Sequence, residues 1–150
     1  MVESHLNPMS TLNRAIEIAA AAHAGQLDKA GQPYILHPLR VMLRVDGEDA
    51  RIAAVLHDVV EDTPVTFEQL VAEGFAPTVI EAVRALTKLP GESRLVAAQR
   101  AAAHSVARAV KLADNTENMD LTRIANPTEK DFARLEEYKV VRAALLAAAT

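Results

Sequence analysis

The sequence predicts an all-α fold, and three observations support this prediction. Half of the residues are hydrophobic but only 3% are aromatic, so a core of Ala, Leu, Val and Ile is expected, which favours closely packed helices over a sheet. No segment of strand length alternates apolar and polar residues. Cap residues, glycines and prolines recur at intervals of about one helix length, where they mark the starts and ends of helices. We expect a loose tail over residues 1–9 and one domain of roughly seven to eight helices over residues 10–150.

Composition excludes several classes of partner. The formal net charge is −4 at pH 7 and no long basic run occurs, so a nucleic acid is not an expected partner. No apolar run approaches the roughly 20 residues of a membrane span. The chain has no cysteine, which excludes thiolate metal sites and is compatible with a reducing compartment. We therefore expect a cytoplasmic protein whose metal ligands come from His, Asp and Glu.

The first helix is predicted from an N-cap at Ser10 or Thr11 to about His23, with a stop at Gly25. We interpret His23 as a partly buried core histidine. The residues expected on the inward face of this helix, at spacings of three and four, are Ile16, Ala19, Ala20 and His23.

A polar loop over residues 26–33 leads to a second helix, predicted from about Pro38 to Val45 because proline is tolerated in a first turn. His37 lies at or just before the start of this helix, where a rigid backbone can aim its ring inward. Gly47 ends this segment, and the central helix is expected to begin at the next residue or the one after it.

The chain is organised around residues 54–63, which read as a buried helix. This segment carries one histidine and three acids among apolar residues: His57, Asp58, Glu61 and Asp62. Residues four apart lie about 40° apart on a helix, so His57 shares a face with Glu61, and Asp58 with Asp62. Burying such acids is costly without a compensating cation, which predicts a metal ion touching His57 and Asp58. The alternative is an amphipathic surface helix whose acids face solvent.

Further helices are predicted after residue 63. They span about 66–73, 77–88, 93–115 and 129–148. Thr66 and Gln69 form a capping-box pattern for the first of them, and His104 with Ser105 divides the third into two. Thr128 caps the last helix, whose expected core stripe is Phe132, Leu135, Tyr138, Val141 and Leu145.

Four stretches form a pattern in register over residues 10–145: 22–26 (AHAGQ), 33–38 (PYILHP), 56–63 (LHDVVEDT), and 110–114 (VKLAD) with 118–119 (NM). Residues 86–89 (LTKL) add a weaker fifth. This pattern resembles the HD-domain metal-dependent phosphohydrolases, and more closely the hydrolase domain of RelA/SpoT-type alarmone enzymes. A length of 150 residues leaves no room for a synthetase or regulatory domain. The expected protein is therefore a stand-alone small alarmone hydrolase, similar to the metazoan SpoT homologue.

The resemblance implies an HD-type helical fold around a central metal site and a specific chemistry. It implies that Glu61 and Asp62 position and deprotonate the attacking water, and that the 3′-pyrophosphate of (p)ppGpp is removed to give GDP or GTP and pyrophosphate. A carboxylate beside a metal can take a proton from water at neutral pH, in agreement with this. The resemblance also implies Mn²⁺, with another divalent metal as the alternative, held by His37, His57, Asp58 and Asp114.

The resemblance also points to three substrate-binding residues. Asn118 matches an asparagine that contacts substrate, Tyr34 would stack on or edge the base, and Lys29 would meet phosphates. The alternatives stay open at this point. Asn118 would then be a cap or turn residue, Tyr34 a core aromatic with a satisfied hydroxyl, and Lys29 an ordinary loop lysine.

Departures from the family pattern lie around the predicted pocket. An acid in place of an arginine would repel phosphate, so we expect a pocket rim with fewer bases and more acids around an intact metal centre. The positions where the family usually carries basic, aromatic or apolar residues are here Leu27, Asp28, Asn115, Thr116, Glu117 and Asp120.

Three functions remain as hypotheses, and the first is favoured. The first is an Mn²⁺-dependent alarmone pyrophosphohydrolase. The second is an HD phosphohydrolase that acts on another nucleotide or phosphate ester, which Asp28 and Glu117 favour. The third is a catalytically idle nucleotide-binding sensor, against which the Glu61 and Asp62 pair argues. A small nucleotide is the expected ligand, and the alanine-rich helices are compatible with a homo-oligomer.

Overall fold

The computed structural model describes residues 10–148, and within them the chain forms nine helices and no strand. The all-α prediction is confirmed. The expected number of helices was roughly seven to eight, and the shortest of the nine has a single turn. The predicted tail over residues 1–9 lies outside the described residues. No described helix is long and apolar enough to cross a membrane. The helices are α1 (Leu12–Ala22), α2 (Leu36–Leu43), α3 (Glu48–Leu56), α4 (Val59–Asp62), α5 (Phe67–Ala72), α6 (Pro77–Leu86), α7 (Arg94–Ala102), α8 (Ser105–Asn118) and α9 (Glu129–Ala148).

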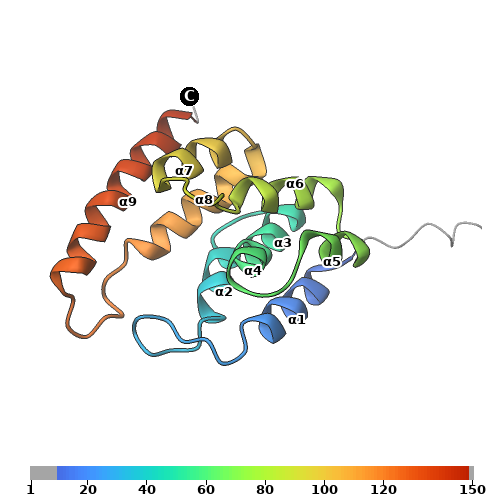
Figure 1. The fold of residues 1–150 in the computed structure, drawn as a ribbon, viewed down its shortest axis with the longest axis horizontal. Helices are drawn as coiled ribbons and strands as arrows, with labels where there is room; N and C mark the ends of the chain where they lie inside the picture. Colours follow the sequence, from blue (N-terminus) through green and yellow to red (C-terminus); the bar gives the residue numbers. More distant parts are fainter. Residues whose placement is uncertain (1–9, 149–150) are drawn as a thin grey trace, which may run out of the picture.

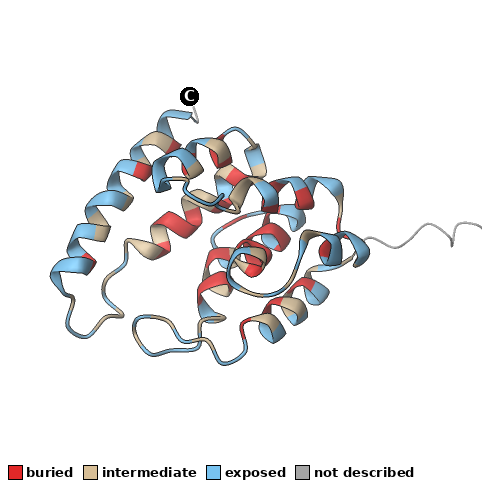
Figure 2. Cartoon of the chain, in the orientation of Figure 1, coloured by how far each residue is buried: buried red, intermediate tan, exposed pale blue. Residues whose placement is uncertain are grey.

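Helix α3 lies at the centre of the fold and contacts α1, α2, α6 and α8, whereas α9 runs along the outer edge against α7 and α8 (Figure 1). The second half of α3 is fully buried over residues 53–56, two of which are alanines. Small side chains let neighbouring helices approach closely, which is how a core poor in aromatics reaches a normal packing density. Buried positions cluster on the facing sides of α2, α3 and α8, while most of the outer side of α9 is exposed (Figure 2).

Several predicted helix ends are confirmed by their caps. The Thr11 side chain accepts a hydrogen bond from the backbone N–H of Arg14 (3.2 Å) at the start of α1. Thr66 and Gln69 form the expected capping box of α5. The expected division between α7 and α8 is also found at His104, whose ring accepts a hydrogen bond from the N–H of the third residue of α8. These caps satisfy donors that helix starts leave without an intrahelical partner.

Helix α2 begins at Leu36, two residues before the predicted start. His37 therefore belongs to the first turn instead of preceding the helix. Pro38 is accommodated because backbone N–H groups of a first turn have no intrahelical acceptor.

The prediction of one continuous central helix is wrong, because the chain breaks at His57 and Asp58 between α3 and α4. The His57 ring supplies the cause: its Nδ1 lies 2.6 Å from the carbonyl oxygen of Ala54 and takes the place of a helical backbone donor. The predicted shared face of His57 and Glu61 therefore does not follow from helical spacing. Asp58 and Asp62 keep that spacing, since the N–H of Asp62 donates to the carbonyl of Asp58 (2.9 Å).

Two residues assigned to the core are exposed. Ala20 faces solvent because the buried side of α1 is centred on Ala15 and Ala19. Phe132 is 52% exposed. At that end of α9 the inward position is occupied by Asp131, which accepts a hydrogen bond from the N–H of Thr128 (2.8 Å).

Glu117 joins α8 to α2 and is not a rim residue, so its predicted place was wrong. Its side chain is only 6% exposed and forms ion pairs with Arg40 of α2 (3.2 Å) and with Arg44, the residue that follows α2. Because α2 carries His37 and α8 carries Asp114, this contact helps to fix the distance between these two side chains.

We expect Glu117→Ala to lower the free energy of unfolding by about 2–4 kcal/mol, because it removes a buried carboxylate from two guanidinium groups. Urea denaturation monitored by circular dichroism measures this loss. Glu48→Ala, at an exposed position of α3, serves as the control and should cost less than about 1 kcal/mol. Equal losses in the two variants would contradict the assigned role of Glu117.

Candidate active site

His37 and Asp114 approach each other from α2 and α8. The two side chains are buried, and His37 Nε2 lies 2.8 Å from Asp114 Oδ1. They are 77 positions apart in the chain, so the packing of the two helices creates this contact.

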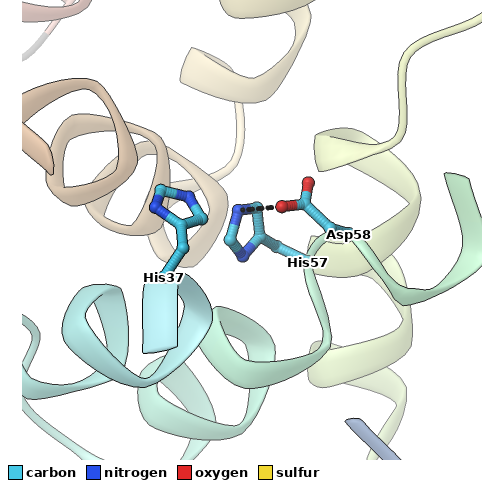
Figure 3. A group of neighbouring side chains, drawn as sticks. All are labelled: His37, His57 and Asp58. Atoms are coloured by element: carbon cyan, nitrogen blue, oxygen red, sulfur yellow. Dashed lines mark ion pairs between the residues drawn. The ribbon is translucent and has the colours of Figure 1, made fainter. Parts of the chain in front are cut away.

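His57 lies at the break between α3 and α4 and adds a second imidazole (Figure 3). Its Nδ1 donates to the Ala54 carbonyl, which leaves Nε2 as the nitrogen that faces the other ligand atoms. Nε2 lies 3.1 Å from Asp58 Oδ2 and 3.4 Å from Asp114 Oδ1. This nitrogen is nevertheless buried without a properly oriented hydrogen bond.

This arrangement requires a positive charge. A lone pair on His57 Nε2 that faces two carboxylate oxygens is repelled unless a proton on this nitrogen or a metal cation lies between them. Burial lowers the pKa of His57, but the charges of Asp58 and Asp114 raise it by more, so the pKa lies well above its ordinary value. The possible ligand atoms of His37, His57 and Asp58 all lie within 4.8 Å of one another. Two imidazoles and two carboxylates fit a divalent metal ion.

Three neighbouring side chains orient the carboxylates. The Tyr34 hydroxyl donates to Asp58 Oδ2. The Lys111 ammonium lies 3.2 Å from Asp114 Oδ2, and the Asn118 amide donates to Asp114 Oδ1 (3.2 Å). Such contacts hold ligand side chains in position and tune their basicity.

The pKa of Asp114 reflects these neighbours. Burial raises it, but the charge of Lys111 and the contacts with His37 and His57 hold the pKa well below its ordinary value. Asp114 is therefore an ionised, negatively charged oxygen donor inside the protein. Lys111 was part of the family pattern but had no predicted role, although its position one helical turn before Asp114 places both on one face of α8.

Glu61 and Asp62 of α4 have different surroundings. The backbone N–H of Lys88, in the segment between α6 and α7, donates to Glu61 Oε1 (2.8 Å) and fixes that carboxylate. The Asp62 carboxylate receives no hydrogen bond from the described residues. Partial burial and then the charges of Asp58 and Glu61 raise its pKa to about 6. The Asp62 carboxylate is thus more basic than that of an ordinary aspartate.

Two pockets are lined in part by residues of the histidine and aspartate cluster. The first, which we call the Tyr34 pocket, has a volume of about 260 Å³ and is lined by Lys29, Tyr34, His37 and Asn118 among others. The second, the Lys111 pocket, has a volume of about 220 Å³. It is lined by His57, Asp58 and Glu61, and by three basic residues, Lys88, Arg94 and Lys111.

A third pocket of about 60 Å³ shares residues with both. Asn118 and Tyr138 also line the Tyr34 pocket, and Arg94 and Lys111 also line the Lys111 pocket. The three predicted substrate residues thus line one pocket. Of the two predicted catalytic acids, Glu61 lines another pocket with His57 and Asp58, and Asp62 lies near enough to Asp58 for that charge to raise its pKa.

One of the acids expected at the rim is paired within the protein. Asp28 lines the Tyr34 pocket, but its Oδ1 accepts hydrogen bonds from the backbone N–H groups of Ala30 and Gln32, both at 2.9 Å. Its Oδ2 lies 3.4 Å from the guanidinium of Arg123. The negative charge of Asp28 is therefore compensated within the protein.

Two further expected rim residues have local partners. Asn115 is buried and its amide donates to the carbonyl of Tyr138 (2.9 Å). Asp120 lines the Tyr34 pocket and accepts hydrogen bonds from Thr122.

Sequence reasoning missed the bases that line the pockets. Two of them stand in matched stretches but were given no role, and the three arginines stand in none; only the fold brings the five together: Lys88, Arg94, Lys111, Arg123 and Arg134.

Comparison with known proteins decides the family. The HD domain matches residues 15–148. The chain belongs to the HD-domain family. A solved structure, described as that of a metazoan orthologue of SpoT that hydrolyses ppGpp and plays a role in starvation responses, matches this HD domain with a TM-score of 0.75. It is 28% identical, and the match covers 94% of this chain and 86% of that chain.

Curated relatives of this HD domain are much longer proteins. A probable GTP pyrophosphokinase of Mycobacterium leprae (strain TN) is 36% identical over 149 residues, which cover 89% of this chain and 18% of the relative. A guanosine-3′,5′-bis(diphosphate) 3′-pyrophosphohydrolase of Haemophilus influenzae is 49% identical over 77 residues, or 48% of this chain and 11% of the relative. The chain thus spans less than a fifth of either relative.

We expect the protein to bind Mn²⁺ at the cluster, and His57→Ala to weaken this binding by more than about 100-fold, because a ligand loss exceeds the 10–100-fold effect of an outer contact. Isothermal titration calorimetry measures the affinity, and thermal unfolding with and without Mn²⁺ measures the linked stabilisation. His104→Ala, outside the cluster, is the control. Unchanged Mn²⁺ affinity in His57→Ala would contradict the assignment.

The raised pKa of Asp62 predicts that ionisation of this side chain lowers the free energy of unfolding of the metal-free protein, by an amount that depends on pH. An unfolded aspartate has a pKa of about 3.9, so the folded state binds more protons between about pH 4 and 6 and loses stability as pH rises through that window. Above about pH 6 the full cost of ionising Asp62 applies. Asp62→Asn removes this cost and should raise Tm more at pH 8 than at pH 4.

Thermal unfolding of the metal-free variants at both pH values tests this expectation. Asp46→Asn, a substitution of a fully exposed loop carboxylate, is the control and should show no such difference. A gain for Asp62→Asn that is the same at both pH values would argue against the raised pKa.

Proposed function

We propose that this protein is a metal-dependent phosphohydrolase that removes the 3′-pyrophosphate of (p)ppGpp, giving GDP or GTP and pyrophosphate. The observation that carries the proposal is the contact of His37 and His57 with Asp58 and Asp114, in a cluster that adjoins Glu61 and three basic side chains in the Lys111 pocket. The names of the Haemophilus relative and of the metazoan SpoT orthologue support this substrate.

The proposed metal is Mn²⁺, and its ligands are His37, His57, Asp58 and Asp114. When bound, such an ion lowers the pKa of water and neutralises charge on phosphoryl oxygens. His57 is prepared for this role because its bond to the Ala54 carbonyl directs the lone pair of Nε2 toward the cluster.

The two acids are proposed to have different roles. Asp62, whose pKa is raised to about 6, accepts the proton of the attacking water, since a general base works best with a pKa near the operating pH. Glu61, held by the N–H of Lys88, orients that water. The water oxygen forms its bond to phosphorus as the bond from that phosphorus to the ribose 3′-oxygen breaks. The proton taken up by Asp62 passes, through solvent, to the 3′-oxygen, which leaves as the hydroxyl group of GDP or GTP.

The two pockets are proposed to receive different parts of the substrate. The Tyr34 pocket would hold the nucleoside, with Tyr34 against the base, and Asn118 and Lys29 at its polar groups. The Lys111 pocket would hold the pyrophosphate, because three basic side chains and the metal ligands line it.

A second candidate is hydrolysis of another nucleotide or phosphate ester. Asp28 and Asp120 line the Tyr34 pocket where the family usually has basic residues, which favours this candidate. The pairing of Asp28 with Arg123 weakens the argument, because a compensated carboxylate repels phosphate less. The idle-sensor hypothesis is disfavoured by the acid pair, which metal binding alone does not need.

We expect Asp62→Asn and Glu61→Gln to lower kcat for ppGpp by at least about 100-fold, the typical contribution of general-base catalysis, while Mn²⁺ affinity stays within a few-fold. Ion-exchange separation of GDP and pyrophosphate measures turnover. Asp46→Asn and Glu48→Gln are exposed controls that should keep wild-type rates.

The outcomes separate the candidates. The proposal is supported if wild type hydrolyses ppGpp only when Mn²⁺ is present and Asp62→Asn loses this activity. Absence of ppGpp hydrolysis in a metal-loaded sample, with turnover of another nucleotide in a panel, would overturn it in favour of the second candidate. Nucleotide binding without turnover of any panel member would favour the sensor.

A further inference from the structure

Helix α4, which carries Glu61 and Asp62, is too short to be stable alone. It has four residues, and isolated helices of this length do not persist because nucleation is unfavourable. Its end is closed by two backbone hydrogen bonds, from Asp62 to Asp58 (2.9 Å) and from Thr63 to Val59 (3.1 Å). The direction of the Asp62 side chain therefore depends on contacts from outside the helix.

One such contact comes from the loop after α1. The side-chain amide of Gln26 donates from Nε2 to the backbone carbonyl of Asp62 (3.3 Å). Carbonyls at a helix end lack an intrahelical donor, so Gln26 satisfies this group from a position 36 residues earlier in the chain.

The amide of Gln26 is itself oriented by His23. Because Nε2 of Gln26 faces a carbonyl, its Oε1 faces the other way and accepts from His23 Nδ1 (2.9 Å). This contact fixes the proton of His23 on Nδ1. The His23 ring is 2% exposed and packs against Tyr34 with ring centroids 5.0 Å apart, so it has little freedom to turn.

The backbone of Gln26 is also held on both sides. Its N–H donates to the His23 carbonyl (3.0 Å), and its carbonyl accepts from the N–H of Tyr34 (2.8 Å). Tyr34 in turn donates its hydroxyl to Asp58. The same small group of residues thus contacts the end of α4 and a carboxylate of the cluster.

We propose that His23 and Gln26 are positioning residues for hydrolysis: the chain of hydrogen bonds from His23 through Gln26 to the Asp62 carbonyl aims the Asp62 carboxylate at the attacking water. The inference rests on the proposed function for its catalytic part. A shift of about 1 Å in a catalytic group can lower a rate by about 100-fold. Residues that hold Asp62 in place, such as His23 and Gln26, therefore affect kcat without contacting substrate.

The test uses the full chain loaded with Mn²⁺. Gln26→Met keeps the length of the side chain and removes the amide, and His23→Leu removes the ring donor. We expect each to lower kcat for ppGpp by about 10–100-fold, with KM and Mn²⁺ affinity within about 2-fold of wild type. The double variant should lose no more than the worse single variant, because both act through one chain of contacts.

Two further variants separate positioning from general damage. In His23→Asn the amide nitrogen occupies nearly the place of Nδ1 and keeps the donor, so kcat should return to within about 3-fold of wild type. Gln32→Met makes the same chemical change at an exposed position of the same loop and should leave kcat unchanged. Losses in His23→Asn as large as in His23→Leu, or in Gln32→Met as large as in Gln26→Met, would overturn the proposal.

A second readout does not depend on activity. Hydrogen exchange measured by mass spectrometry should show faster exchange of the Asp62 and Thr63 amides in Gln26→Met than in wild type or Gln32→Met. If wild type fails to hydrolyse ppGpp, the proposed function fails, whereas the exchange comparison still decides whether Gln26 supports α4. Identical exchange in Gln26→Met and wild type would overturn the positioning inference in either case.

Discussion

A buried imidazole nitrogen between two carboxylates is the interaction on which the rest of this structure depends. His57 Nε2 lies 3.1 Å from Asp58 and 3.4 Å from Asp114 and has no properly oriented hydrogen bond. Two carboxylates and a lone pair in a buried space are unfavourable unless a cation joins them. The chemistry that we propose, in which a metal ion and an acid pair act on water, follows from this requirement.

The surrounding fold holds the four side chains of the proposed metal site. Helix α3 ends where the His57 ring bonds to the Ala54 carbonyl, and this break lies between α3 and the acid pair on α4. Glu117 of α8 pairs with Arg40 of α2 and with Arg44, which follows α2. The cluster is thus assembled by three segments whose mutual positions are set by polar contacts as well as by the alanine-rich core.

Helix caps could be predicted from local patterns and the four cluster residues from the matched stretches, whereas the helix break and the partners of Glu117 could be predicted from neither. Caps such as Thr66 with Gln69 are local patterns and were found where expected. The break at His57 arises from a competition between a side chain and a backbone donor that helical periodicity does not register. The partner of Glu117 lies on another helix, so its charge was assigned to the rim; the bases of the Lys111 pocket were missed for the same reason.

The most direct test of the central claim is a crystal structure of the Mn²⁺-loaded protein with anomalous diffraction recorded at the manganese edge. The account predicts one strong anomalous peak between His57 Nε2, His37 and the carboxylates of Asp58 and Asp114, with the His57 to Ala54 hydrogen bond kept. A cluster without a peak in crystals grown with saturating Mn²⁺, with His57 protonated and bonded to Asp58, would contradict the claim that this buried group is built around a metal ion.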